Sequence, residues 1–183
     1  GGYAAWRLLR DPDTKILIVS KTRSPAARDT GRLIRGWLTT VPFLAHLDPR
    51  DNTNVYASDS VYQFDVAGAT DARSPSVLCQ GIEGQITSTR AHVVIADDVE
   101  TGANTKTVAA RSQLDLQVNE FCNIAEYGDK EVVYFGTCWH PESVYFKVAR
   151  RGFVFRTWPF TYPMPGEQFL NLAPLVARRL RDG

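Results

Sequence analysis

Three carboxylates directly follow a short apolar run near the middle of the chain. Residues 92–100 read HVVIADDVE, so Asp97 and Asp98 are adjacent and Glu100 follows closely. At the carboxyl end of a buried parallel strand, such side chains project into the crevice where ligands bind. One carboxylate there can hold the Mg²⁺ that bridges phosphate groups, and another can orient an attacking water. The same acids can instead begin a surface loop or cap a helix, so this motif alone leaves both interpretations open.

Small and hydroxyl-bearing residues surround the acidic motif. It is preceded by residues 81–92, GIEGQITSTRAH, which carry Arg90 just before the acidic strand. It is followed by residues 132–139, VVYFGTCW, where a second apolar run ends in Gly136 and Thr137. Small polar residues at successive strand ends allow backbone amides and hydroxyls to approach phosphates. Ordinary turns use the same residue types, so both interpretations of Thr137 remain possible.

The rest of the sequence predicts the elements that position these residues. Apolar runs of strand length predict strands over residues 15–20, 61–66, 76–81, 92–96, 132–136 and 153–160. Apolar residues at helical spacing predict helices over residues 3–10, 26–38, 105–124, 143–150 and 167–181. The alternation of buried strands with helices predicts an α/β fold with a mainly parallel sheet flanked by helices.

The composition limits the class of protein. The chain has 183 residues, of which 44% are hydrophobic, enough for one ordinary α/β domain with a core. Its net charge of +1 gives no global basic signal for nucleic acid, so any such contact must come from local patches. The three cysteines lack a Cys-x-x-Cys pair, which argues against a disulfide framework or a zinc knuckle. No apolar run approaches the roughly 18–20 residues that span a bilayer, so we expect a soluble protein without a membrane partner.

Four stretches of the chain resemble the ATPase domain of phage terminase large subunits, most closely the DNA maturase B proteins of short-tailed phages. They run in the family's order from about residue 3 to residue 145 and read AAWRLLRDPDTKILIVSKT, RLIRGWLTTVPFLAHLDP, SVLCQGIEGQITSTRAHVVIADDVE and VVYFGTCWHPESVY. The resemblance implies a P-loop NTPase of the RecA-like (ASCE) type. It also implies ATP and Mg²⁺ as the bound cofactors.

The resemblance assigns roles to the residues of the acidic motif and of the second strand end. By it, Asp97 is the Walker B aspartate that holds Mg²⁺ and contributes to nucleotide binding. Asp98 takes the place where many relatives have the catalytic glutamate that orients water, and Glu100 is the rival for that role. Gly136 and Thr137 match the coupling motif, in which Thr137 senses the γ-phosphate and relays hydrolysis to movement.

Arg90 and the ends of the chain complete the comparison with that family. By resemblance, Arg90 is a candidate for the arginine that stabilises transition-state charge, in its own subunit or in a neighbouring one. A loop arginine that pairs with a nearby carboxylate is the alternative. The sequence contains no G-x-x-x-x-G-K-[ST] motif, which in the family immediately precedes the helix that matches residues 1–10. We therefore expect an N-terminally truncated ATPase domain over residues 1–160. Residues 161–183 would then form a linker or docking helix toward an absent nuclease domain.

The function implied by the resemblance is that of a packaging motor. The intact protein would hydrolyse ATP to translocate double-stranded DNA into a procapsid, in the host cytoplasm during assembly of a bacteriophage virion. The implied partners are double-stranded DNA, the portal protein, the small terminase subunit and further copies in a ring. A helicase-like DNA translocase and a non-catalytic DNA- or portal-docking fragment are the alternatives. Without a phosphate-binding loop, the chain alone is expected to be inactive.

Overall fold

The structure is a computed structural model that describes all but a few short segments of the chain. The described residues are 1–53, 58–70, 74–84, 86, 89–125, 130–161, 163–164 and 167–182. Three positions of the polar stretch before the acidic motif, Gln85, Thr87 and Ser88, therefore lie outside the described residues. The chain forms two compact units, Gly1–Val144 and Tyr145–Gly183, and the predicted site residues all belong to the first.

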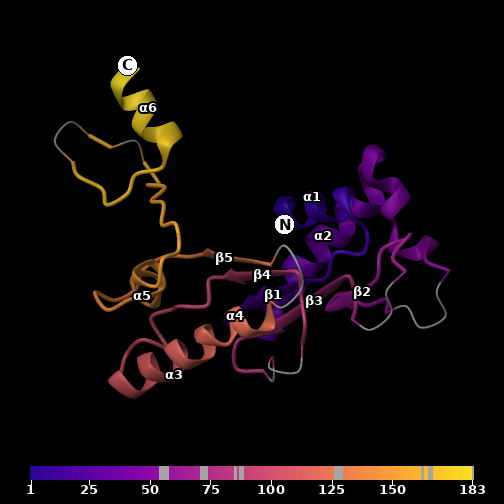
Figure 1. Ribbon diagram of the computed structural model, residues 1–183, viewed down its shortest axis with the longest axis horizontal. Coiled ribbons are helices and arrows are strands. Elements are labelled where there is room, and N and C mark those ends of the chain that lie inside the picture. The colour runs from indigo at the N-terminus through magenta and orange to yellow at the C-terminus, as the bar shows by residue number, and fades with distance from the viewer. Residues whose placement is uncertain are drawn as a thin grey trace. The chain divides into compact units, whose positions relative to one another are not determined.

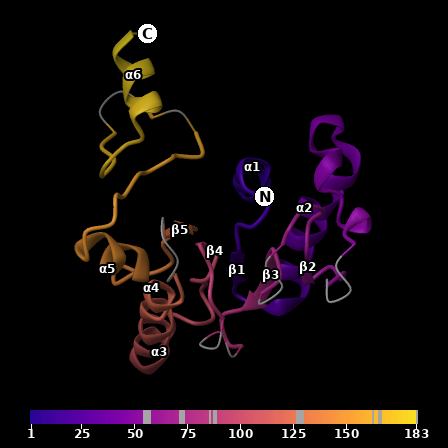
Figure 2. The ribbon, with the colours of Figure 1, turned by 45° about the vertical axis from the view of Figure 1, so that its right-hand side comes forward.

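A five-stranded sheet forms the centre of the first unit. Its strands are β1 (Ile16–Ser20), β2 (Gln63–Phe64), β3 (Val77–Gly81), β4 (Val93–Asp97) and β5 (Glu131–Phe135). They lie side by side in the order β2-β3-β1-β4-β5, as Figures 1 and 2 show. The pairs β1–β3, β1–β4 and β4–β5 are parallel, whereas β2 is antiparallel to β3. The prediction of an α/β fold with a mainly parallel sheet is confirmed.

The helices are distributed over both units, and the first four in chain order belong to the first unit. They are α1 (Gly2–Arg10), α2 (Arg28–Thr40), α3 (Val108–Asn119), α4 (Phe121–Ile124), α5 (Val144–Arg150) and α6 (Pro174–Asp182). Shorter helical segments are η1 (Arg23–Ala27), η2 (Pro42–Leu47) and η3 (Pro49–Asp51). None of the described helices combines the length and the apolar character needed to cross a membrane.

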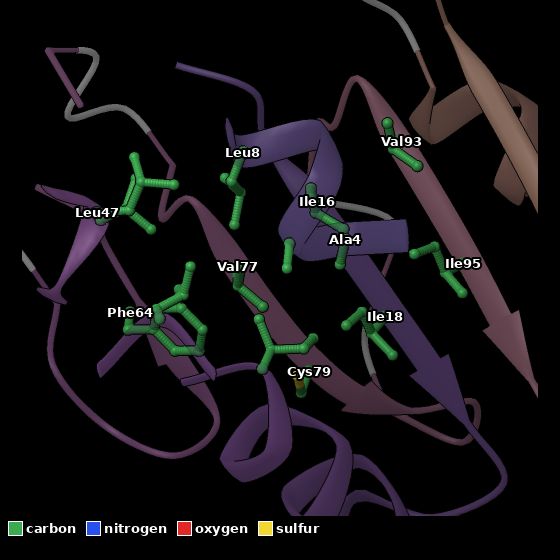
Figure 3. Close-up of a cluster of buried hydrophobic side chains, with 14 of the residues drawn as sticks. Ala4, Leu8, Ile16, Ile18, Leu47, Phe64, Val77, Cys79, Val93 and Ile95 are labelled. Atoms are coloured by element: carbon green, nitrogen blue, oxygen red, sulfur yellow. The ribbon is translucent and has the colours of Figure 1, made fainter. Parts of the chain in front are cut away.

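The helices α1 and α2 cover one face of the sheet. Alternate strand residues point to this face, so Ile16 and Ile18 of β1 are buried there with Ile95 of β4. Leu8 of α1 and Ile34 of α2 belong to the same cluster and are completely buried, and Figure 3 shows Leu8 beside the strands. Burial of such side chains contributes about 1.5–3 kcal/mol each, which fixes both helices against β1 and its neighbours.

The helices α3 and α4 cover the opposite face. The intervening residues of β1, Leu17 and Val19, are fully buried on this side. Phe121, at the start of α4, stacks on Tyr134 of β5 with ring centroids 6.0 Å apart. Gln117 of α3 donates a hydrogen bond from Nε2 to the carbonyl beyond the end of β3, at 3.1 Å. The first unit is therefore a three-layer α/β/α arrangement, visible in Figure 1.

Two predicted strands differ from the structure. The prediction over residues 153–160 is wrong, because this segment forms only an isolated bridge between Thr157 and Leu172. Its side chains alternate between exposed and half-buried, so no second layer covers it as the apolar run had suggested. The predicted strand over residues 61–66 is reduced to the two residues of β2 at the edge of the sheet.

Two predicted helices are shorter than their apolar patterns. The helix predicted over residues 105–124 begins only after Thr107, whose side chain accepts a hydrogen bond from the Ala110 amide at 3.1 Å. Such an N-cap fixes a helix start more firmly than the apolar pattern does. The helix predicted over residues 167–181 begins at Pro174, a residue type favoured in the first helical turn.

Candidate active site

Three parallel strands bring polar residues to one edge of the sheet. In the strand register, Ser20 at the end of β1 lies opposite Asp97 at the end of β4, and Asp97 lies opposite Phe135 at the end of β5. After β1 the chain passes to the α2 face, whereas after β4 it passes to the α3 face. In open α/β sheets such a change of direction marks the crevice that binds ligands, which by this rule is expected between the carboxyl ends of β1 and β4.

Asp97 occupies the position next to this crevice. Its side chain is half-buried, and among the residues that the structure describes none donates a hydrogen bond to its carboxylate. Burial raises the pKa of Asp97, and the neighbouring negative charge of Asp98 raises it further. The fold alone therefore leaves the negative charge of Asp97 poorly compensated, as expected for a carboxylate that receives a cation.

Asp98 is exposed and holds an unusual backbone conformation. Its φ angle is 48°, in the left-handed region that aspartate tolerates better than most residues other than glycine. Its amide donates a hydrogen bond of 3.0 Å to the carbonyl oxygen of Phe135, which ties the turn after β4 to the end of β5. The carboxylate of Asp98 is thus accessible to solvent on a turn that is fixed by the backbone.

Glu100 lies in a different environment from the other two carboxylates. Its side chain is completely buried. The Trp139 amide donates to Oε1 at 2.7 Å, the Ser143 hydroxyl donates to Oε2 at 2.8 Å, and the Val144 amide donates to Oε2 at 2.7 Å. Both oxygens are therefore occupied by donors from the loop after β5. Of the two residues predicted to compete for orienting water, only Asp98 has a solvent-accessible side chain.

Gly136 and Thr137 directly follow β5 and are both exposed. Because β5 is the parallel neighbour of β4, these residues lie at the same edge as Asp97 and Asp98. Neighbouring strands lie about 4.8 Å apart, so a hydroxyl at the end of β5 and a carboxylate at the end of β4 can contact one ligand. The structure thus brings together Asp97, Asp98, Gly136 and Thr137.

Arg90 is not brought to this edge. It precedes β4, whereas Asp97 ends it, so the whole length of that strand separates them. Arg90 lies near Lys15 and Ile16 at the amino end of β1, and its Nη1 donates to the Thr89 carbonyl at 3.2 Å. A role for Arg90 within the site of its own subunit has no geometric support here, and a role toward a neighbouring subunit stays a prediction.

Ser20 is a further polar residue at this edge of the sheet. It is 2% exposed, and its hydroxyl has no hydrogen-bond partner in the described part of the chain. It lies between Gly81 of β3 and Asp97 of β4 in the register. The signal in the sequence is its position as the last residue of the apolar run 15–20, a polar residue at a strand end.

Two carboxylates at this edge are side chains of the kind that bind Mg²⁺. Within the described ranges, no group of three or more His, Cys, Asp or Glu side chains is placed to hold a metal ion. Asp97 and Asp98 offer hard oxygen ligands, and Mg²⁺ takes few protein ligands because it keeps several waters and binds phosphate oxygens. The residues present therefore fit Mg²⁺ that arrives with a phosphate ligand.

Comparison with known proteins identifies a relative of the whole chain. No family model matches the sequence. The terminase large subunit of Enterobacteria phage T3 is 36% identical to it over 187 residues. The match covers 99% of this chain but only 31% of the length of that relative. The resemblance predicted from the ordered sequence stretches is therefore confirmed: this chain is related, over almost its entire length, to a phage terminase large subunit.

Proposed function

We propose that this chain is part of the ATPase motor of a viral DNA-packaging terminase, which hydrolyses ATP to move double-stranded DNA into a procapsid. One observation carries the proposal: Asp97 and Asp98 at the end of β4 share a sheet edge with Gly136 and Thr137 at the end of β5. The similarity to a terminase large subunit supports the packaging role. The proposal places the fold in the P-loop NTPase class, with the Walker B strand at β4.

Each residue at this edge has a proposed part in hydrolysis. Asp97 would hold Mg²⁺, which when bound neutralises charge on the phosphates. Asp98, exposed on its fixed turn, accepts a hydrogen bond from the attacking water and so orients it. Thr137 donates a hydrogen bond from its hydroxyl to the terminal phosphate, and the exposed backbone of Gly136 allows that phosphate to approach. These roles require a ligand whose phosphates lie across the ends of β4 and β5.

The position of α1 is consistent with a phosphate-binding loop at this site. The nitrogen of Gly1, which directly precedes α1, lies near enough to Asp97 to interact with it electrostatically, so this helix begins near the acidic strand end. A loop joined to that start would lie beside Asp97, with the amide groups of the first helical turn directed at an anion. Since the chain contains no G-x-x-x-x-G-K-[ST] motif, we expect ATP turnover from the whole protein and not from this chain alone.

The remaining partners belong to the same proposal. They are double-stranded DNA, the portal protein, the small terminase subunit and further copies of the large subunit in a ring, all in the host cytoplasm. The domain limits, with the ATPase over residues 1–160 and a linker or docking helix over residues 161–183, also stay a prediction.

Packaging of DNA into procapsids tests this function. In the whole protein, Asp97→Asn removes the charge that holds Mg²⁺ while keeping the size of the side chain, so we expect packaging to fall to background. The matched control is Asp51→Asn, which changes an exposed aspartate in η3 far along the chain from the site. Normal packaging by the Asp97→Asn protein would refute the proposal. Strand separation without any need for a procapsid would instead favour a helicase-like translocase.

A further inference from the structure

We propose that Glu100 is a positioning residue whose buried carboxylate holds the loop after β5, and with it Thr137, at the sheet edge that carries Asp97. This inference rests on the proposed function, because it assigns Glu100 a part in the same ATP-hydrolysing site. The same inference excludes Glu100 from the role of orienting water, because its side chain is completely buried.

The carboxylate of Glu100 connects the loop that follows β4 to the loop that follows β5. It accepts hydrogen bonds from the Trp139 amide at 2.7 Å, the Ser143 hydroxyl at 2.8 Å and the Val144 amide at 2.7 Å. The donors thus bracket the loop, since Trp139 lies shortly after Thr137 and Val144 begins α5. Hydrogen bonds to a charged acceptor are about twice as strong as neutral ones, and burial keeps water from replacing them.

The loop after β4 is a firm base for this connection. Asn104 donates from Nδ2 to the Val99 carbonyl at 2.8 Å and accepts from the Thr101 amide at 2.8 Å. The hydroxyl of Thr105 donates to the Thr101 carbonyl at 2.9 Å. Val99 is itself fully buried, so the residues on both sides of Glu100 are fixed. A displacement of the loop after β5 must therefore break bonds to Glu100.

The loop after β5 has little else to fix its first half. Residues 135–139 are all exposed, and 136–139 belong to neither a helix nor a strand. Farther along, the Ser143 amide donates to the His140 carbonyl at 2.9 Å, and Glu142 pairs with Arg111 at 3.0 Å. The Trp139 amide is the first group after Thr137 that attaches this loop to Glu100, whereas before Thr137 the Phe135 carbonyl accepts a hydrogen bond from the Asp98 amide at 3.0 Å. Loss of the Trp139 attachment would leave Thr137 held firmly on the β5 side alone, and this would loosen the position of its hydroxyl.

The variant that tests this role is Glu100→Gln in the whole protein. Glutamine keeps the size, but its NH₂ group faces a donor amide in place of one carboxylate oxygen. We expect kcat for ATP to fall about 10–100-fold with KM for ATP within about twofold, because misplacement of a phosphate-contacting group weakens the transition state more than binding. The matched control is Glu142→Gln, an exposed carboxylate in the same loop, which should leave kcat unchanged.

Hydrogen exchange measures the connection without reference to ATP. In the same two proteins, the Trp139 and Val144 amides should exchange at least about tenfold faster in Glu100→Gln and at the normal rate in Glu142→Gln. Unchanged exchange would overturn the connection itself. Faster exchange with normal kcat would overturn the positioning role and leave the proposed function intact. The proposed function is tested separately, by the activity of the Asp97→Asn protein. Failure of the positioning role can therefore be distinguished from failure of the proposed function.

A double-mutant cycle separates positioning from direct catalysis. Ser143→Ala removes one of the three donors and serves as the milder variant if Glu100→Gln does not fold. If Glu100 acts through the loop, Ser143→Ala lowers kcat severalfold, and the double variant is no worse than Glu100→Gln alone. Two results would overturn the proposal: a normal kcat for Ser143→Ala, or a double variant whose loss of kcat is the product of the two single losses. Either result would show that Glu100 does not act on hydrolysis through the loop.

Discussion

At the scale of single residues, Asp97 is placed where its charge suits the proposed function but destabilises the fold. It is half-buried beside Asp98, and in the described part of the chain no donor satisfies its carboxylate. Burial of a charge without a partner costs free energy, which a bound cation would recover. This predicts that the site residue is unfavourable for the stability of the protein in the absence of its ligand.

The pKa of Asp97 predicts the sign of a stability change. It is raised above its ordinary value of 3.8, so ionisation weakens the fold as pH rises through that range, and the cost is present at neutral pH. Asp97→Asn should therefore raise the Tm of the protein, on the order of 2 °C at pH 7, without nucleotide or Mg²⁺. The gain should shrink as the pH approaches 4, where the wild-type carboxyl group becomes protonated. Calorimetry at several pH values measures it.

The control for this stability change is Asp51→Asn. Asp51 is exposed at the end of η3, so its replacement should leave Tm unchanged. A lower Tm for Asp97→Asn at pH 7, or a gain that does not depend on pH, would contradict the assignment of an uncompensated charge to Asp97.

At the scale of elements, a buried polar cluster fixes the other end of the strands. Lys15, just before β1, is 2% exposed, and its Nζ lies 3.9 Å from Oδ1 of Asp65. The Asp65 carboxylate also accepts hydrogen bonds of 2.9 Å from the amides of Ser76 and Ser58. The cluster joins the start of β1 and of β3 to the segment after β2. It is distant from the crevice and therefore serves stability.

Asp65→Ala should destabilise the fold without a specific effect on the site. It removes an acceptor from two amides and a negative charge from beside Lys15, for which we expect a loss of about 3 kcal/mol in the free energy of unfolding. Denaturant unfolding measures this loss. Asp29→Ala, in an exposed pair with Arg28, is the comparison and should cost at most about 1 kcal/mol. Equal effects of the two variants would refute the structural role of Asp65.

Strands could be predicted from the sequence where their run of apolar residues corresponds to side chains that are buried in the fold. The runs that became β1 and β4 are apolar on consecutive positions and buried almost throughout, because helices cover both faces at the centre of the sheet. The strands β3 and β5 are less buried, and their apolar runs predicted their existence but not this difference. The run over residues 153–160 has similar residue types, but within the described ranges it forms only the single bridge from Thr157 to Leu172. Pairing partners are a property of the tertiary fold, so a local pattern could not distinguish this segment from a strand.

The site was predictable to the extent that it depends on strand ends. Asp97, Asp98 and Thr137 follow apolar runs, and parallel strands necessarily bring such residues to one edge. The environment of Glu100 depends on contacts with residues 39 to 44 positions away, which no spacing in the sequence reveals. Arg90 and Asp98 are close in sequence but lie at opposite ends of β4, since a strand separates residues that a helix would bring together.

At the scale of the whole molecule, the order of the strands determines where the chemistry can occur. Because β1 lies between β3 and β4, the chain changes direction between β1 and β4, and the crevice is expected beside Asp97. The chain spans 31% of the length of the related terminase large subunit, so the site must be tested in the whole protein. Thermal stability reports on the fold, whereas turnover of ATP reports on the crevice itself.

The rate of ATP hydrolysis by the whole protein carrying Asp97→Asn tests the central claim most directly. If Asp97 holds Mg²⁺ at the ends of β4 and β5, kcat should fall at least about 10³-fold, a loss typical for the removal of a charge that stabilises a transition state. The fall should occur although the variant is folded and no less stable than the wild type. Hydrolysis at the wild-type rate would contradict the assignment of this sheet edge as the ATP-hydrolysing site.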